Sequence, residues 1–211
     1  MPAPAAPGPA AGTLVLATRN AGKLRELARI LGGQVNLSGL EEFPDAPDVP
    51  ETGATFEANA LLKARAIADH TGLPAVADDS GLCVDALGGM PGVFSARWAG
   101  AHGDDKANLV LVLAQVADVP DIRLGARFVC AAALVVPGSA SHGRAPREVV
   151  VTGSLEGRLI RVPRGTGGFG YDPIFLPDGF SRTTAEMTAE EKDAISHRGR
   201  AFRSLVTYIS P

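Results

Sequence analysis

The chain has 211 residues, 45% of them apolar and 20% charged, which is enough for one domain with a sizeable core. Its net charge of −3 at pH 7 argues against a protein that coats nucleic acid, because such proteins carry a basic surface. No apolar run reaches the roughly 18 residues of a membrane span. We therefore expect a soluble globular protein with neither a membrane nor a nucleic acid as its partner.

The cysteines and the N-terminal segment bear on the cellular compartment. Cys83 and Cys130 form no C-x-x-C pair, so neither a disulfide framework nor a zinc site is expected, and a reducing cytoplasmic location fits better. Residues 1–12 are rich in Pro and Ala and lack Lys and Arg, unlike a signal peptide. We expect a disordered tail there, followed by a single domain over residues 13–211.

The first predicted elements are a strand, a tight turn and a helix. Thr13–Thr18 (TLVLAT) is a short apolar run typical of a buried strand, and Asn20 stands where a helix N-cap belongs. Apolar residues then recur at helical spacing over 24–31 until the glycine pair 32–33. A weaker strand candidate follows at 35–37. This order forms half of a βαβ unit.

The middle of the chain predicts a loop, a helix and a hairpin. Glu42–Pro50 is rich in Pro and Asp and predicts a loop, while Thr52–His70 carries an apolar face at helical spacing. Ala75–Ala77 is typical of the end of a strand, and Asp78–Gly81 is typical of a turn. Leu82–Leu87 is then expected to pair back as the second arm of a hairpin.

The remaining elements complete an α/β pattern. A helix is expected to open at Asp104-Asp105, and Arg127–Val136 is the longest apolar run and predicts a central strand that pairs with Glu148–Leu155. The S/T-x-x-E pattern that starts at Thr188 predicts a capped short helix, and residues 201–209 predict a final one. We expect a mixed sheet flanked by helices, in two lobes with a cleft between them.

The first segment suited to chemistry is Thr18–Lys23 (TRNAGK), between the first strand and the first helix. Backbone N–H groups at a helix start, a nearby glycine and a lysine one turn further make a phosphate cradle plausible. The segment is not a Walker A loop, which requires Gly at Ala17 and Ser or Thr at Leu24. A capped turn with a solvated lysine is the alternative.

The second segment is Ala77–Gly81 (ADDSG). Its paired carboxylates suit Mg²⁺, which prefers one or two carboxylates together with waters and phosphate oxygens. Strand alternation sends neighbouring side chains to opposite faces, so Asp78, Asp79 and Asp85 cannot all be ligands. Glu51 precedes a predicted helix and either completes a metal site or favours the helix dipole. An Asp-rich turn is the alternative.

The third segment is Gly165–Asp172 (GTGGFGYD), with four glycines in six residues. Glycines let the backbone approach a ligand closely, and Phe169 and Tyr171 can stack on a flat base. A hairpin with a packed aromatic ring is the alternative interpretation.

The fourth segment is Lys192–Arg198 (KDAISHR). On one continuous helix, Lys192 and His197 would lie about 140° apart, so they converge on a ligand only if the helix breaks between them. Ser196 is a natural N-cap for a new helix, which would place two basic residues in its first turn. Cations there oppose the helix dipole unless an anion binds, and this favours a functional role.

These segments together resemble one family. The motifs TRNAGK, ETGATFEANALLKA, ADDSGLCVDALGGMPGVFSARWAG, GTGGFGYDPIF and EEKDAISHRGRA resemble those of the house-cleaning nucleoside triphosphate pyrophosphatases that act on inosine, deoxyinosine and xanthosine triphosphates. The resemblance runs from about Leu14 to about Leu205. It implies an Mg²⁺-dependent homodimer with an elongated mixed sheet and a nucleotide in the cleft. It also implies cleavage between the α and β phosphates, which gives a nucleoside monophosphate and pyrophosphate.

The resemblance also implies roles for individual residues. Asp79 corresponds to the general base and a metal ligand, and Ser80 lies beside it on the substrate. The second metal carboxylate is assigned to Glu51, because the position before it is Pro50 where bacterial relatives often carry another acid. The remaining substrate contacts are the triphosphate segment Thr18, Arg19, Asn20, Ala21, Gly22 and Lys23, the base-recognition segment Phe169, Gly170, Tyr171 and Asp172, and the basic group Lys192, His197 and Arg198.

The residues suit direct attack of water on the α phosphorus, since no arrangement for a covalent intermediate is present. Selectivity would rest on the 6-oxo group of the base, which a donor such as Arg198 or a backbone N–H near the Gly-rich loop can recognise. Three alternatives remain open. They are a P-loop kinase or GTPase, a pyrophosphatase with a pyrimidine triphosphate preference on a similar fold, and an inactive nucleotide sensor.

Overall fold

The computed structural model describes residues 13–31, 35–138 and 145–209. The expected tail at 1–12 and the expected helix stop at 32–33 therefore lie outside the described residues. Six strands form one sheet in the order β2-β1-β3-β4-β5-β6. The strands are β1 (Thr13–Leu16), β2 (Asn36–Ser38), β3 (Ala75–Val84), β4 (Gly125–Val136), β5 (Arg147–Leu159) and β6 (Phe175–Pro177). The α-helices are α1 (Ala21–Leu31), α2 (Phe56–Thr71), α3 (Asp105–Gln115), α4 (Ala189–Ile195) and α5 (His197–Val206).

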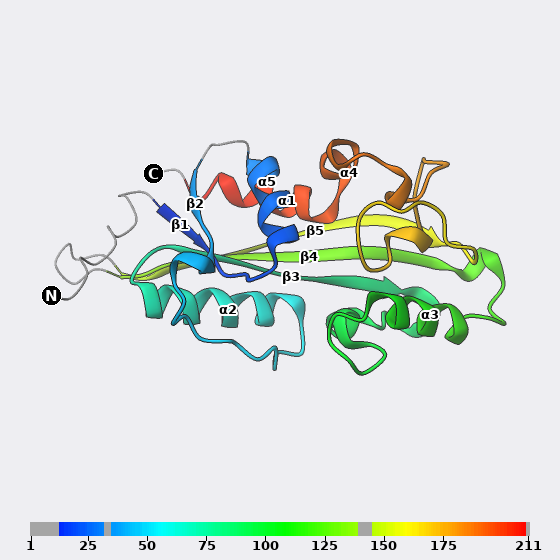
Figure 1. The fold of residues 1–211 in the computed structure, drawn as a ribbon, viewed down its shortest axis with the longest axis horizontal. Helices are drawn as coiled ribbons and strands as arrows, with labels where there is room; N and C mark the ends of the chain where they lie inside the picture. The colour runs from blue at the N-terminus through cyan, green and yellow to red at the C-terminus, as the bar shows by residue number, and fades with distance from the viewer. Residues whose placement is uncertain (1–12, 32–34, 139–144, 210–211) are drawn as a thin grey trace, which may run out of the picture.

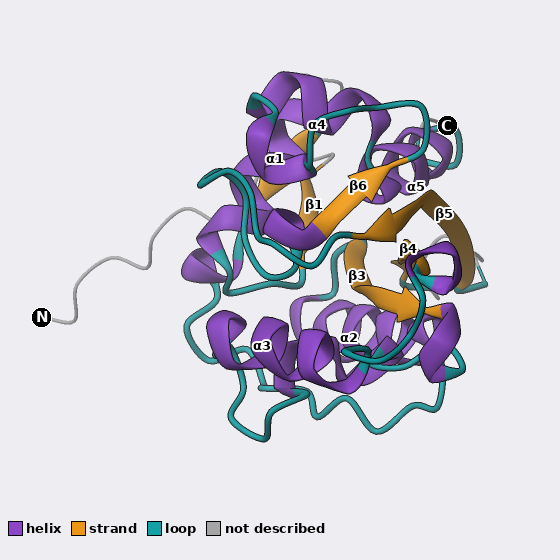
Figure 2. Ribbon diagram, turned by 90° about the vertical axis from the view of Figure 1, so that its right-hand side faces the viewer, coloured by secondary structure: helices purple, strands orange, loops and turns teal. Residues whose placement is uncertain are grey.

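The sheet is mixed, as the sequence predicted. Strand β1 pairs in parallel with β2 and β3, whereas β3, β4, β5 and β6 pair antiparallel in succession. Long strands β3, β4 and β5 run through most of the molecule and give it an elongated shape (Figure 1). Helices α1, α4 and α5 lie on one side of the molecule and α2 and α3 on the other (Figure 2). The sheet passes between α1 and α5 on one face and α2 on the other, which gives three layers.

The core divides between the two faces of the sheet. On one face, α2 packs through an apolar stripe on the alanine-rich parts of β3 and β4. At the far end of these strands, α3 packs on Leu82 and Val84, which by strand alternation share the opposite face with Val76. On the other face, α1 and α5 pack on the opposite side of the same strands. Both faces of β3 and β4 are therefore buried, which explains why their sequences are nearly continuous apolar runs. Within the described ranges, no helix is long and apolar enough to cross a bilayer.

The predicted hairpin at the second chemical segment is wrong. Residues Asp78–Gly81 form no turn, because β3 continues as one strand from Ala75, opposite Val135, to Val84, opposite Ala126. The strand continues because Asp78 and Asp79 face small alanines of β4, and because their carboxylates find basic or amide partners from distant segments. The prediction that neighbouring aspartates point to opposite faces is confirmed by these different partners.

One side of β3 lacks a neighbouring strand at its centre. Strand β1 ends early, so its last paired residue is Leu16, opposite Val76, and the Ala17 N–H donates to the Val76 carbonyl. Further along, the Leu82 N–H donates to the hydroxyl of Ser95, which belongs to the 3₁₀ segment η3 (Gly92–Arg97). Between these points, no described strand pairs with this edge of β3. The edge opens where the two aspartates lie.

The break between the last two helices is confirmed. Helix α4 begins with the predicted capping box of Thr188 and Glu191 and ends before Ser196, whose backbone is extended (φ −63°, ψ 153°). The Ser196 hydroxyl then accepts from the Gly199 N–H at 2.9 Å and caps α5. Because the helix is interrupted there, the basic side chains on its two sides can face one cleft.

Candidate active site

A cleft of about 960 Å³ opens over the centre of β3. Four segments far apart in the sequence line it: the β1–α1 turn, β3, the Gly-rich loop and the α4–α5 junction. The structure therefore brings together the residues that the sequence singled out for binding and catalysis, apart from Ala21, whose side chain lies outside the described part of the structure. Those that line it are Thr18, Arg19, Asn20, Gly22, Lys23, Glu51, Asp79, Ser80, Phe169, Gly170, Tyr171, Asp172, Lys192, His197 and Arg198.

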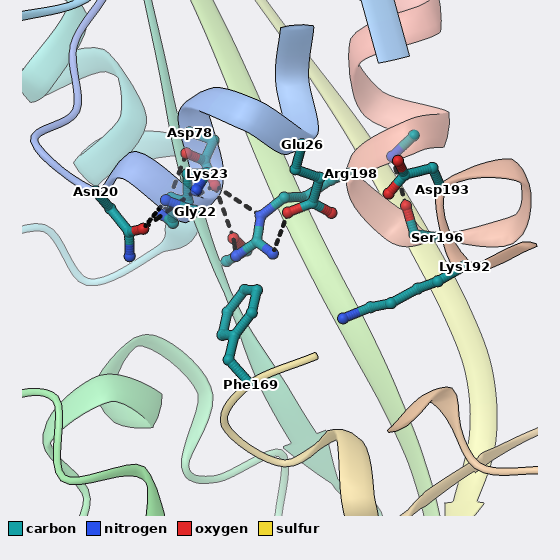
Figure 3. A network of polar contacts seen from close by, with 12 residues as sticks. Asn20, Gly22, Lys23, Glu26, Asp78, Phe169, Lys192, Asp193, Ser196 and Arg198 are labelled. Carbon is teal, nitrogen blue, oxygen red and sulfur yellow. Dashed lines mark hydrogen bonds and ion pairs between the residues drawn. The ribbon is translucent and has the colours of Figure 1, made fainter. Parts of the chain in front are cut away.

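The β1–α1 turn is held by its own side chains. The Asn20 side-chain oxygen accepts from the N–H groups of Gly22 at 2.8 Å and Lys23 at 3.1 Å, which confirms the predicted N-cap. The Thr18 hydroxyl accepts in turn from the Asn20 N–H at 3.1 Å. This capping places Lys23 one turn into α1, with its ammonium directed at β3 (Figure 3).

On one face of β3, the Asp78 carboxylate lies among basic groups. The Lys23 ammonium donates to both of its oxygens, at 3.2 and 3.1 Å, and the Arg198 Nε donates at 3.3 Å. The Ser80 hydroxyl donates to the same carboxylate at 2.8 Å. Burial raises the pKa of Asp78, but the charges of Lys23 and Arg198 outweigh it and hold the pKa far below its ordinary value. Asp78 is therefore an ionised anchor for two cations.

Arg198 connects this anchor to α1. Its Nη1 donates to the Glu26 carboxylate at 3.2 Å and its Nη2 donates to the Ser80 hydroxyl at 2.9 Å. Figure 3 shows the guanidinium between Asp78 and Glu26, above the ring of Phe169. A buried arginine with two carboxylate neighbours stays charged, because these neighbours raise its pKa against the effect of burial.

On the other face of β3, Asp79 lies in a less basic environment. Its Oδ2 accepts from the Asn59 amide at 2.9 Å and its Oδ1 accepts from the Ser80 N–H at 3.0 Å. The Lys63 ammonium lies 3.8 Å from Oδ1. Burial raises the pKa of the Asp79 carboxyl above its ordinary value, and the nearby charge of Glu51 raises it further. Asp79 therefore has the more basic carboxylate of the two adjacent aspartates.

Glu51 lies near Asp79 and is held by two cations. The Lys63 ammonium donates to Oε1 at 2.9 Å and Arg97 donates to Oε2 at 2.9 Å. Burial raises the pKa of Glu51, but Lys63 and Arg97 outweigh it, so the pKa lies below the ordinary value. The Lys63 ammonium thus stands between two carboxylates.

These two carboxylates could hold a metal ion. Among the described residues, no group of three His, Cys, Asp or Glu side chains forms a candidate metal cluster. A pair of carboxylates around one cationic group nevertheless suits Mg²⁺, which keeps several waters and binds substrate phosphate oxygens. The donor set therefore fits a divalent ion that can also contact a phosphorylated ligand. Asp85 lies outside the cleft and pairs with Arg127 at 3.0 Å.

The two aromatic residues of the Gly-rich loop lie in different environments. Tyr171 is packed in the core and its hydroxyl donates to the Ser95 carbonyl at 2.8 Å, so it follows the packed-aromatic interpretation. Phe169 faces the cleft, with Lys192 Nζ 4.9 Å and Arg198 Cζ 5.1 Å from its ring centroid. Phe169 is therefore the loop's exposed aromatic surface for a ligand.

The Asp172 carboxylate holds this loop in place. It accepts from the Phe169 N–H at 2.8 Å, from the Thr184 hydroxyl at 2.7 Å and from the Lys192 ammonium. Gly168 adopts φ 71°, and a Cβ there would lie 2.0 Å from the Asp172 carboxylate. Glycine is needed at this position because both the backbone angle and the space exclude a side chain.

His197 is buried at the start of α5. Its ring stacks on Phe128 with centroids 4.9 Å apart and an interplanar angle of 13°, and its Nδ1 has no hydrogen-bond partner among the described residues. Burial lowers the pKa of His197 well below its ordinary value, and the nearby charge of Arg198 lowers it further. The imidazole is therefore neutral near pH 7.

The buried imidazole predicts how stability depends on pH. Because its pKa is lower in the folded protein, the unfolded chain takes up a proton that the folded protein does not, as the pH falls below about 6.5. We expect the free energy of unfolding to fall by up to about 1.4 kcal/mol per pH unit in this range. Urea titrations of the wild type and His197→Gln test this. The variant should show a flatter pH dependence, and equal slopes would contradict it.

Sequence reasoning missed four residues that shape the site. They are Glu26, Asn59, Lys63 and Arg97. A signal existed for two of them, because Asn59 and Lys63 are four residues apart and project from one side of α2. The other two act through partners distant in the sequence, at Arg198 and Glu51, and leave no local pattern.

Together, the mixed sheet between layers of helices and the charged cleft define an α/β protein suited to bind a polyanionic ligand. A model described as the Ham1 family matches residues 14–208, and the chain belongs to this family. A dITP/XTP pyrophosphatase of Streptomyces coelicolor is 61% identical over 199 residues, covering 93% of this chain and 96% of the relative.

Solved structures agree with this assignment. The nucleoside-triphosphatase / dITP/XTP pyrophosphatase of Mycobacterium abscessus is 57% identical with a TM-score of 0.74, covering 92% of this chain and 98% of that one. The Staphylococcus aureus Ham1 protein is 36% identical with a TM-score of 0.81, covering 93% of this chain and 97% of that one.

Proposed function

We propose that this protein hydrolyses inosine, deoxyinosine and xanthosine triphosphates to the nucleoside monophosphate and pyrophosphate, which removes them from the nucleotide pool. One observation carries the proposal. At the open edge of β3, two cations gather around Asp78 on one face, and a carboxylate pair, Glu51 and Asp79, lies on the other. A triphosphate and its metal ion need these two environments side by side. The names of the relatives support the substrate class.

The phosphate chain would lie against the β1–α1 turn. A triphosphate carries up to about four negative charges, and helix N-termini with nearby basic groups compensate such charge. Thr18 to Lys23 supply the capped turn, and Lys23 supplies a cation from the first turn of α1. Arg198 supplies a second cation across the cleft. Binding would redirect Lys23 from Asp78 toward the phosphates, while Arg198 would compensate their charge from across the cleft.

The carboxylate pair would hold Mg²⁺ and activate water. Mg²⁺, when bound by Asp79 and Glu51, neutralises phosphate charge and lowers the pKa of a bound water. Asp79 takes the proton from the attacking water, because its carboxylate lines the cleft beside the proposed metal position. The water oxygen forms a bond to the α phosphorus, and the bond from this phosphorus to the bridging oxygen breaks. The electron pair leaves with pyrophosphate.

The base would stack on the Gly-rich loop. Phe169 offers an exposed ring, and Asp172 fixes the loop that carries it. Arg198 and backbone N–H groups of this loop can donate to a 6-oxo group, whereas an adenine amino group would leave them unpaired. Lys192 and His197 complete the wall of the cleft beside the base. We assign Ser80 to the substrate through its hydroxyl, which already joins Asp78 to Arg198.

We also propose a cytoplasmic homodimer with one domain over residues 13–211. The two free and buried thiols, Cys83 and Cys130, support a reducing compartment. The dimer rests on the family resemblance, and light scattering should give about twice the chain mass of 21.7 kDa.

A substrate panel tests the proposed function. Inosine, deoxyinosine, xanthosine, adenosine, guanosine and uridine triphosphates would be incubated with Mg²⁺ and with EDTA, and pyrophosphate and orthophosphate would be measured separately. We expect pyrophosphate from the first three and its loss on chelation. Orthophosphate release would contradict the reaction. Equal cleavage of all six would contradict the base selectivity, and preferred cleavage of the uridine compound would favour the pyrimidine alternative.

A further inference from the structure

Asn59 is a buried amide between the two carboxylate segments of the cleft. It lies on α2, which runs along the face of β3 that carries Asp79 (Figure 1). Its side chain is fully buried (0% exposed), although it carries two polar atoms. Its amide nitrogen donates to Asp79 Oδ2 at 2.9 Å, and its oxygen accepts from the Gly53 N–H at 2.7 Å. Both polar atoms are therefore satisfied by groups beside the catalytic machinery.

The two partners fix the orientation of this amide. An ionised carboxylate only accepts hydrogen bonds and a backbone N–H only donates, so the Asn59 nitrogen must face Asp79 and its oxygen must face Gly53. A serine at this position is too short to reach both partners, and an aspartate has no donor for Asp79. An asparagine side chain accepts from the Gly53 N–H and donates to the Asp79 carboxylate without adding a charge.

Gly53 allows the close approach that this link requires. A Cβ added to Gly53 would lie 2.7 Å from the Asn59 side-chain oxygen, 2.7 Å from the Ala58 Cβ and 3.0 Å from the backbone nitrogen of Asn59. A side chain there would therefore push the amide away. Gly53 is two residues after Glu51, so the amide ties the segment that carries one carboxylate to the other carboxylate.

The amide also decides which way the Asp79 carboxylate faces. Asn59 takes Oδ2 and the Ser80 N–H takes Oδ1, so both oxygens have a fixed donor. The nearest cation, Lys63, is farther away, at 3.8 Å from Oδ1. Without Asn59, the carboxylate could turn toward Lys63, which would remove it from the position where it meets water and metal.

We infer that Asn59 is a positioning residue that sets the orientation of Asp79 and fixes its position relative to the segment that carries Glu51. This inference rests on the proposed function, because it concerns the same two carboxylates. A shift of about 1 Å in a reacting group costs about 10²-fold in rate, and loss of an outer partner of a metal ligand costs about 10- to 100-fold in metal affinity.

The test compares Asn59→Ser with Asn108→Ser. Asn108 is also a buried asparagine (1% exposed) whose side-chain oxygen accepts from a backbone N–H, that of Ala99, but it does not line the cleft. Both variants lose an amide, so both should lower Tm. We expect only Asn59→Ser to lower kcat for deoxyinosine triphosphate, by about 10²-fold with KM unchanged. It should also weaken binding of Mn²⁺ alone, measured calorimetrically without nucleotide, by about 10-fold or more.

The outcomes separate the inference from the proposed function. Wild-type kcat, or wild-type Mn²⁺ affinity, in Asn59→Ser would overturn the positioning role. If that variant does not fold, Gly53→Ala replaces it, because its Cβ displaces the amide while Asn59 itself stays. The same losses would then support the role, and wild-type behaviour would overturn it. A wild-type protein that releases no pyrophosphate would refute the proposed function, and Mn²⁺ binding would still test Asn59.

Discussion

Replacing Asp79 with asparagine is expected to lower kcat for pyrophosphate release by about 10²- to 10⁴-fold, the usual contribution of a general base. The amide matches the carboxylate in shape but takes no proton from water. It also removes one of the two proposed metal ligands. The protein should still fold, because an uncharged amide removes the cost of burying a charge there, but the amide offers one acceptor to the two donors, the Asn59 amide and the Ser80 N–H. Tm is therefore expected to fall modestly.

Activity and stability measured on the same sample test this prediction. Initial rates at saturating Mg²⁺ give kcat, and thermal unfolding gives Tm. Asp85→Asn is the matched control, because Asp85 follows Asp79 closely in the chain but pairs with Arg127 outside the cleft. The control should keep wild-type kcat. A folded Asp79→Asn protein with near wild-type kcat would show that another group accepts the proton.

Replacing Asp78 with asparagine should affect stability instead. We expect the free energy of unfolding to fall by about 3–5 kcal/mol, the cost of removing one partner of a buried ion pair. Lys23 and Arg198 would then face each other without the carboxylate that balances both. Because the folded pKa of Asp78 is lowered, its stabilising effect is full above the unfolded pKa, about 4, and is lost as the pH falls further.

Urea unfolding at pH 7 measures the effect of Asp78→Asn. The adjacent variant Asp79→Asn is the control, since it changes the same functional group one residue away on the opposite face. Asp78→Asn should be the less stable of the two variants, because it leaves two buried cations without the carboxylate that balances them. Equal stability of Asp78→Asn and the wild type would contradict the anchor role of this carboxylate.

The sequence predicted those parts of the site that depend on local signals. The Asn20 cap, the capping box of Thr188 and Glu191, and the Ser196 cap were confirmed because a side chain there bonds to a backbone N–H two or three residues away. The two basic residues at the start of α5 predicted a bound anion, which stays a prediction, because in the structure Arg198 pairs with the protein's own Asp78 and His197 is neutral. Interactions between residues close together in the chain were sufficient to predict these caps.

Long-range pairing decided what the sequence did not predict. Asp78–Gly81 has the composition of a turn, but the carboxylates are compensated by Lys23, Arg198 and Asn59, so the strand continues through them. Likewise, Arg97 reaches Glu51 across 46 positions of the chain. Neither a motif nor a periodicity records such partners. These distant partners explain why the residues that line the site were predictable, whereas the hydrogen bonds and ion pairs among them were not.

The central claim is that water attacks the α phosphorus at the carboxylate pair. It is tested most directly by hydrolysing deoxyinosine triphosphate with Mg²⁺ in ¹⁸O-labelled water under single-turnover conditions and weighing the products by mass spectrometry. We predict one labelled oxygen in deoxyinosine monophosphate and none in pyrophosphate. Label in pyrophosphate, or in released orthophosphate, would mean that a different phosphorus is attacked, and would contradict this account.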